Sequence, residues 1–156
     1  MGKTIAWATL VAGTLDILSA FAWSALLGGS LAGILPSVAS GPFGDTLPDG
    51  PSTQILGLAV HFAIMAAMVT VYVLAVRTIP ALNRNWTIAG LLYGLALWFV
   101  MYWIVLPVRF VEFHHPGALW PIVRQLISHC LLVGLPIAWI ARRERTRNAF
   151  GRNHLP

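Results

Sequence analysis

The sequence predicts an all-α membrane protein: a polytopic bundle of four transmembrane helices with both termini in the cytoplasm. Three observations lead to this prediction: the composition, four long apolar runs and the distribution of the basic residues. Of the 156 residues, 58% are hydrophobic and only 10% are charged. A soluble domain usually carries about 25% charged residues. A chain with so few charges has too little polar surface to stay dissolved in water.

Length, charge and cysteine content narrow the class further. A chain of 156 residues suits one compact domain, residues 1–156. The net charge of +5 would suit a nucleic-acid-binding protein, but the basic residues lie where membrane topology requires them, so we expect no nucleic-acid partner. Cys130 is the only cysteine, which excludes an intrachain disulfide and any two-cysteine metal or redox motif.

Four apolar runs are long enough to cross a bilayer, which takes roughly 20 helical residues. Ser52 and Thr53 are expected to cap the second span, Pro107 to end the third, and Pro136 to kink the fourth. The small-x-small sequence at residues 20–22 also allows a cleaved signal peptide; we favour a retained span because the run continues beyond it. The predicted spans are residues 5–27, 54–76, 86–106 and 119–140, followed by a basic tail, residues 141–156.

The connection between the first two spans, residues 28–53, is rich in Gly, Pro and Ser. Its apolar part, Leu31–Ala39, would suit an interfacial or re-entrant segment. We favour a plain exposed loop, since turn-forming residues such as Pro48-Asp49-Gly50 dominate the rest.

The basic residues predict the orientation. They gather at the N-terminus, in the connection 77–85 and in the tail, as Lys3, Arg77, Arg84, Arg142, Arg143, Arg145, Arg147 and Arg152. The two other connections hold only Arg109. Cytoplasmic loops carry the excess of Lys and Arg, so both termini are expected in the cytoplasm.

Small residues indicate where helices approach closely. Ala12 and Ala20 flank Asp16 at intervals of four residues in the first span, and Gly90 and Gly94 form a GxxxG pair in the third. Both patterns are typical of helix–helix contacts in lipid.

Four ionisable residues fall inside the predicted spans: Asp16, His61, Arg124 and His129. An ionisable group in hydrocarbon is costly, so each is expected to face the bundle and find a partner. Asp16 and His129 lie about 15–16 Å from the outer ends of their spans, with the other two just above. Gln125 and Ser128 flank them on the fourth span. We expect one polar cluster in the outer half of the bundle.

This cluster has two main interpretations. In the structural one, Asp16 neutralises Arg124 or accepts a hydrogen bond from His129, and the network only fixes helix order. In the functional one, the cluster is a small-ligand or proton site open to the outside, because Asp and His are the usual residues of proton relays.

Cofactor and metal candidates are fewer. His61 and His129 lie on different helices and allow bis-His haem ligation, although no cofactor is the first expectation. Glu112, His114 and His115 are weak zinc candidates in an outer connection. The chain has no P-loop, G-x-S-x-G, HExxH or paired carboxylates, so we expect no enzymatic activity.

Several short motifs point to a family: ASGPFG, HF, LYG, VLP and GLPIA. Together they resemble a group of small, uncharacterised bacterial four-helix inner-membrane proteins. The resemblance implies a multi-pass protein of the bacterial inner membrane and carries no activity.

The leading functional expectation is a non-enzymatic accessory or structural subunit, embedded in the lipid bilayer, that forms a homo-oligomer or joins a larger membrane complex. The alternative is a proton-linked transporter or small-ligand-binding protein that uses the polar cluster. A bis-His haem-binding electron carrier comes third.

Overall fold

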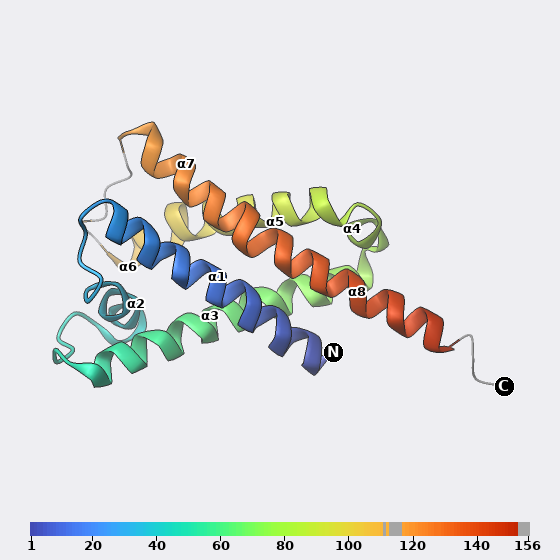
Figure 1. Cartoon of the computed structure of the whole chain (residues 1–156), viewed down its shortest axis with the longest axis horizontal. Coiled ribbons are helices and arrows are strands. Elements are labelled where there is room, and N and C mark those ends of the chain that lie inside the picture. Colours follow the sequence, from blue (N-terminus) through green and yellow to red (C-terminus); the bar gives the residue numbers. More distant parts are fainter. Residues whose placement is uncertain (111, 113–116, 153–156) are drawn as a thin grey trace.

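The computed structural model describes residues 1–110, 112 and 117–152, with side chains as far as Arg143. Within these residues it is mostly helical and contains no strand, which confirms the predicted all-α class. Four helical rods are long and apolar enough to cross a membrane: Gly2–Leu26, Pro51–Thr78, Trp86–Arg109 and Leu119–Arg143. Figure 1 shows them as one bundle, with the start of α1 and the end of α8 at the same end.

The first two rods are single helices, α1 (Gly2–Leu26) and α3 (Pro51–Thr78), and the short helix α4 (Pro80–Arg84) leads to the third. The other two rods each contain a π-helical segment. The third rod runs through α5 (Trp86–Phe99), η1 (Val100–Val105) and α6 (Leu106–Arg109), and the fourth through α7 (Leu119–Ile127), η2 (Ser128–Gly134) and α8 (Leu135–Arg152).

Each π-helical segment ends two residues before a proline, Pro107 or Pro136. A proline inside a helix has no N–H to donate, and its ring crowds the carbonyl four residues earlier. The wider π turn accommodates this defect without ending the rod. The predicted end of the third span at Pro107 is therefore wrong, because α6 continues to Arg109. A π-helical segment, η2, ends just before Pro136; the kink predicted at this proline stays a prediction.

The connection between the first two spans is not a plain loop, and that prediction is wrong. Residues Ile34–Phe43 form a helix, α2, which packs against the first half of α3. Gly57 allows this contact, because a Cβ there would collide with the carbonyl of Leu35. Locally the sequence favours turns, so the helix depends on its tertiary contact.

The start of α3 also differs from the prediction. Its N-cap is Gly50, whose φ of 138° lies in a region that favours glycine, and Pro51 occupies the first turn, where a missing N–H is tolerated. Ser52 and Thr53 are inside the helix. Instead of capping it, Thr53 Oγ1 donates a hydrogen bond of 2.5 Å to the carbonyl of Pro48.

Arg109, at the end of α6, holds the C-terminal end of α2. Its Nε donates to the carbonyl oxygen of Gly41 at 2.6 Å, and its Nη2 donates to that of Ser40 at 2.6 Å. The same Nη2 lies 3.1 Å from the carboxylate of Asp45. A cation at the last carbonyls of a helix is favourable, because these groups form the negative end of the helix dipole.

Replacing Arg109 with Gln is expected to loosen α2 without unfolding the bundle. Hydrogen bonds from a charged donor contribute about 1.5–3 kcal/mol, so hydrogen exchange across residues 34–43 should accelerate by at least about tenfold. Asp45→Asn is the matched control, since its ion pair is largely exposed and contributes about 0–1 kcal/mol. Equal acceleration in both variants would show that the ion pair, and not the carbonyl contacts, holds α2.

The bundle is packed tightly in the half that carries the termini. Ala8 and Ala12 of α1 are fully buried there, among Val69 of α3 and Val133 and Ile137 of the fourth rod. The other half, which carries α2 and the start of α7, contains the polar residues and the cavities described below. We call it the α2 end.

The third and fourth rods meet at three glycines. A Cβ on Gly94 would collide with the carbonyl oxygen of His129, and a Cβ on Gly134 would collide with that of Gly90. Contact this close is possible only without side chains. The contact at these glycines determines how η2, which carries Ser128 and His129, faces the bundle.

Candidate functional site

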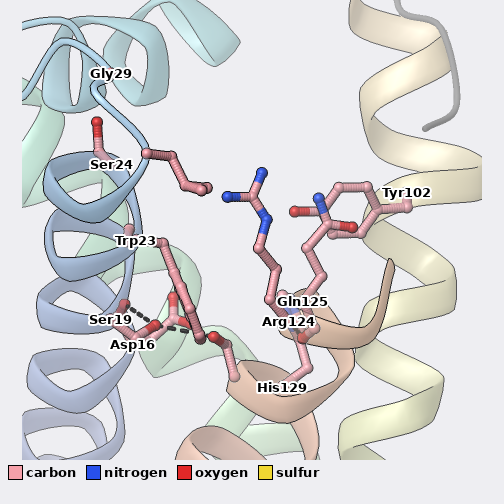
Figure 2. A pocket seen from close by; sticks show the side chains of 12 residues that line it. Asp16, Ser19, Trp23, Ser24, Gly29, Tyr102, Arg124, Gln125 and His129 are labelled. Atoms are coloured by element: carbon pink, nitrogen blue, oxygen red, sulfur yellow. Dashed lines mark hydrogen bonds between the residues drawn. The ribbon is translucent and has the colours of Figure 1, made fainter. Parts of the chain in front are cut away.

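A polar cleft opens at the α2 end between α1 and the fourth rod, with η1 on its far side. Its volume is about 420 Å³, within the usual range of roughly 300–1,000 Å³ for small-ligand pockets. Figure 2 shows its side chains. Its lining includes the polar side chains of Asp16, Ser19 and Ser24 of α1, Tyr102 of η1, Arg124 and Gln125 of α7, and Ser128 and His129 of η2.

Arg124 and Asp16 both line this cleft but do not pair with each other. Among the described residues, none forms a hydrogen bond or ion pair with the guanidinium of Arg124. The carboxylate of Asp16 likewise accepts no hydrogen bond there; only its backbone carbonyl does so, from Ser19. In Figure 2 the guanidinium extends from α7 into the space beside α1. The expected neutralisation of one by the other is therefore wrong.

Serine hydroxyls join α1 to η2 at the base of the cleft. Ser19 Oγ donates to the carbonyl oxygen of Asp16 at 2.8 Å and lies 3.0 Å from Ser128 Oγ. Because a hydroxyl has one hydrogen, Ser128 donates to Ser19. This chain of bonds fixes α1 beside η2 and does not involve the Asp16 carboxylate.

The structural interpretation expected His129 to donate a hydrogen bond to Asp16, but His129 donates elsewhere. Its Nδ1 lies 3.0 Å from the backbone carbonyl of Gln125. A carbonyl only accepts, so Nδ1 carries the proton. The ring also contacts Tyr102 edge-to-face, with centroids 5.9 Å apart. The other nitrogen, Nε2, has no partner among the described residues.

His61 lies on the other side of Asp16, in a middle cavity of about 240 Å³. Its Nε2 donates to the carbonyl oxygen of Gly13 at 2.9 Å, which leaves Nδ1 as an acceptor. Asp16, Tyr102 and His129 line both this cavity and the polar cleft. The predicted cluster is thus divided: Arg124 belongs to the cleft, His61 to the middle cavity, and Asp16 and His129 to both.

The geometry does not favour bis-His haem ligation. The imidazole nitrogen Nε2 of His61 is bonded to the α1 backbone, so the ring is held against a neighbouring helix. The middle cavity, which lies between the two histidines, is also smaller than the usual ligand pocket.

The zinc hypothesis for the outer connection lies largely outside the described residues, because His114 and His115 fall there. Glu112 lies in a turn. In the described ranges, no group of three His, Cys, Asp or Glu side chains gathers closely enough to hold a metal ion.

The residues predicted to pack between helices lie in different places in the structure. Ala12 is fully buried in the core, and Gly90 and Gly94 form the crossing with the fourth rod. Ala20 is only partly buried and lines the polar cleft. Its small side chain leaves room for the cleft.

Sequence reasoning missed Ser19, Trp23, Ser24 and Tyr102 as cleft residues. The first three follow Asp16 at intervals of 3, 7 and 8 residues, so they share its helical face, and this periodicity would have identified them. Trp23 packs edge-to-face on Trp120 of α7, with ring centroids 5.9 Å apart. Tyr102 had no comparable signal.

Comparison of the chain with protein-family models, with characterised proteins and with solved structures finds no match.

Proposed function

We propose that this chain is a non-enzymatic integral membrane protein that binds a small zwitterionic ligand in the polar cleft. The observation that carries this proposal concerns Arg124 and Asp16, which line different walls of one cleft. Within the part of the chain that the structure describes, their charged groups form no ion pair or hydrogen bond. Charged groups inside a bundle normally pair, because each is costly in hydrocarbon. Two opposite charges that line one cavity without pairing suit a ligand that carries both complements.

The chemistry of the lining defines the ligand. The planar guanidinium of Arg124 binds a carboxylate or phosphate with two parallel hydrogen bonds. The Asp16 carboxylate only accepts, so it suits an ammonium group. The nearby hydroxyl groups and the Nε2 acceptor of His129 offer further polar contacts. This interpretation develops the small-ligand alternative that the sequence left open.

The accessory-subunit hypothesis has less support. It relied on small residues as contact surfaces for a partner, but Gly90, Gly94 and Ala12 contact other helices of the same chain. An oligomer or larger membrane complex remains a prediction that awaits a co-purification experiment.

We also propose how the protein is oriented in the membrane. With the basic residues at the end that carries the termini, that end is placed in the cytoplasm, and the cleft then opens in the outer half of the bilayer. The motif resemblance supports a bacterial inner membrane.

O-phosphoethanolamine, which carries a phosphate and an ammonium group, is the probe that tests the site. At 100 times its dissociation constant it should stabilise the detergent-solubilised protein by about 2.7 kcal/mol. Loss of the two-bond contact in Arg124→Gln should weaken binding roughly 100-fold. Thermal unfolding with increasing probe measures both effects.

Two control variants test the contributions of the two charged residues to binding separately. Asp16→Asn should weaken O-phosphoethanolamine binding but leave inorganic phosphate binding unchanged, because phosphate has no ammonium group. Arg84→Gln removes an equal charge at the other end of the bundle and should change neither. If Arg84→Gln and Arg124→Gln weakened binding equally, the attraction would be general electrostatics and the proposed site would be refuted.

A further inference from the structure

The middle cavity is lined by nearly all the methionines of the chain. The sequence contains four methionines, and every one except Met1 lines this cavity: Met65, Met68 and Met101. Methionine often fills irregular gaps in a hydrophobic core, but these three side chains border a space of about 240 Å³. A cavity bordered by three thioether groups has room for a metal ion.

A histidine imidazole joins two of these methionines on one wall. His61 precedes Met65 by four residues and Met68 by seven, so the three share one face of α3. Both His61 and Met65 are buried, so water competes little for their donor atoms. Met101 belongs to η1 and lines the cavity from the third rod. One nitrogen donor and three sulfur donors therefore reach the same cavity from two rods.

The hydrogen bond of His61 leaves its ring in the state that a metal ion requires. Its Nε2 donates to the carbonyl oxygen of Gly13 at 2.9 Å, so the lone pair lies on Nδ1. Metal-binding histidines almost always donate their other ring N–H to a carboxylate, a backbone carbonyl or water, which fixes the tautomer and the orientation of the ring. Among the described residues, Nδ1 of His61 has no hydrogen-bond partner.

The types of donor select the metal. Zinc sites use Cys, His, Asp and Glu, and within the described residues no three of these gather closely enough to hold an ion. Thioether sulfur is a soft donor that selects Cu(I), and imidazole also suits copper. Asp16 borders the same cavity, and its negative charge offsets that of a cation where the dielectric constant is low.

We propose that the middle cavity is a Cu(I) site, in which one ion is bound by Nδ1 of His61 and by the thioether sulfurs of Met65, Met68 and Met101. Methionine is unbranched and has three rotatable bonds, so its sulfur can close on an ion without movement of the helix. The inference does not depend on the ligand proposed for the polar cleft, because these four residues do not line the cleft.

Titration of the full chain in detergent with Cu(I), in competition with the chelator bathocuproine disulfonate and with ascorbate as reductant, tests the proposal. The wild type should bind one ion per chain. The triple variant Met65→Leu, Met68→Leu, Met101→Leu should bind Cu(I) at least about 100-fold more weakly, since losing one hydrogen-bond partner of a ligand already costs about 10–100-fold. Exchanges of Met for Leu nearly conserve volume, so the variant should stay folded.

His61→Gln tests the nitrogen donor. Glutamine can still donate an N–H to the carbonyl of Gly13, but an amide offers no imidazole nitrogen to the ion. Binding of Cu(I) should weaken at least about tenfold. An affinity equal to that of the wild type would show that His61 is not a ligand and would overturn the proposed donor set.

Cys130→Ala is the matched control. Cys130 carries the only thiol of the chain, and a thiolate is itself a soft ligand for Cu(I), but this residue does not line the cavity. Cys130→Ala should therefore bind Cu(I) as the wild type does. X-ray absorption of the copper-loaded protein should show sulfur bound to copper in both, and no bound sulfur in the triple variant.

The outcomes decide the copper site separately from the cleft. If the wild type binds no Cu(I), if the triple variant binds it as tightly as the wild type, or if Cys130→Ala loses it, the inference fails. If the triple variant is not monodisperse, Met68→Leu and Met101→Leu are measured singly, and unchanged affinity in both also refutes the site. Binding of O-phosphoethanolamine to the wild type without copper tests the proposed function alone, so either proposal can fail while the other stands.

Discussion

Gly94→Ala should be among the most destabilising single substitutions in this chain. The added Cβ would collide with the carbonyl oxygen of His129 and lie 2.6 Å from the Cα of Cys130. Overpacking usually costs about 1–3 kcal/mol, and here the obstacle is backbone, which cannot rotate away. We expect a loss of at least about 3 kcal/mol and a fall of roughly 10 °C in the thermal midpoint. Fluorescence-detected size-exclusion chromatography after heating measures the midpoint.

Gly41→Ala is the control for this experiment. Gly41 is also helical, but a Cβ there meets nothing within 4 Å, and Ala is favoured over Gly in a helix by about 1 kcal/mol. Its midpoint should stay unchanged or rise. A Gly94→Ala midpoint as high as that of Gly41→Ala would mean that the third and fourth rods do not cross where the structure places them.

Gly57→Ala is expected to separate α2 from α3. The new Cβ would collide with the carbonyl oxygen of Leu35 and lie 2.6 Å from its carbonyl carbon. The two helices must move apart at a cost of about 1–3 kcal/mol.

Hydrogen exchange distinguishes this effect from general unfolding. In Gly57→Ala, exchange should accelerate across residues 34–43 and stay slow in the core around Val69 and Ile137. Combining the substitution with Arg109→Gln should add little further acceleration, since both changes free the same helix. Unchanged exchange across α2 would show that its contact with α3 is looser than described.

The four rods were predictable from sequence because hydrocarbon imposes a severe condition. Every backbone polar group must be paired within the segment, so long apolar runs become helices. Helix α2 was not predictable in the same way. Its Gly, Pro and Ser residues favour turns locally, and two distant residues, Gly57 and Arg109, stabilise the helix through tertiary contacts.

The site was predictable in part for the same reason. Asp16, Arg124 and His129 were identified because ionisable groups in apolar runs must face the bundle, and all three line the polar cleft. Their pairing was not predictable. Depth along a helix follows from the residue number, whereas the direction of a side chain depends on the rotation of the helix about its axis.

The sequence by itself determined which segments are apolar enough to cross a membrane, which charges they carry, and at what depth. The tertiary structure decided the rest. The glycine crossing of the third and fourth rods sets how η2 faces α1, and that rotation brings His129 against its own backbone and leaves Asp16 and Arg124 apart. The physical reason is that close packing admits only certain rotations, and no local pattern in the chain encodes them.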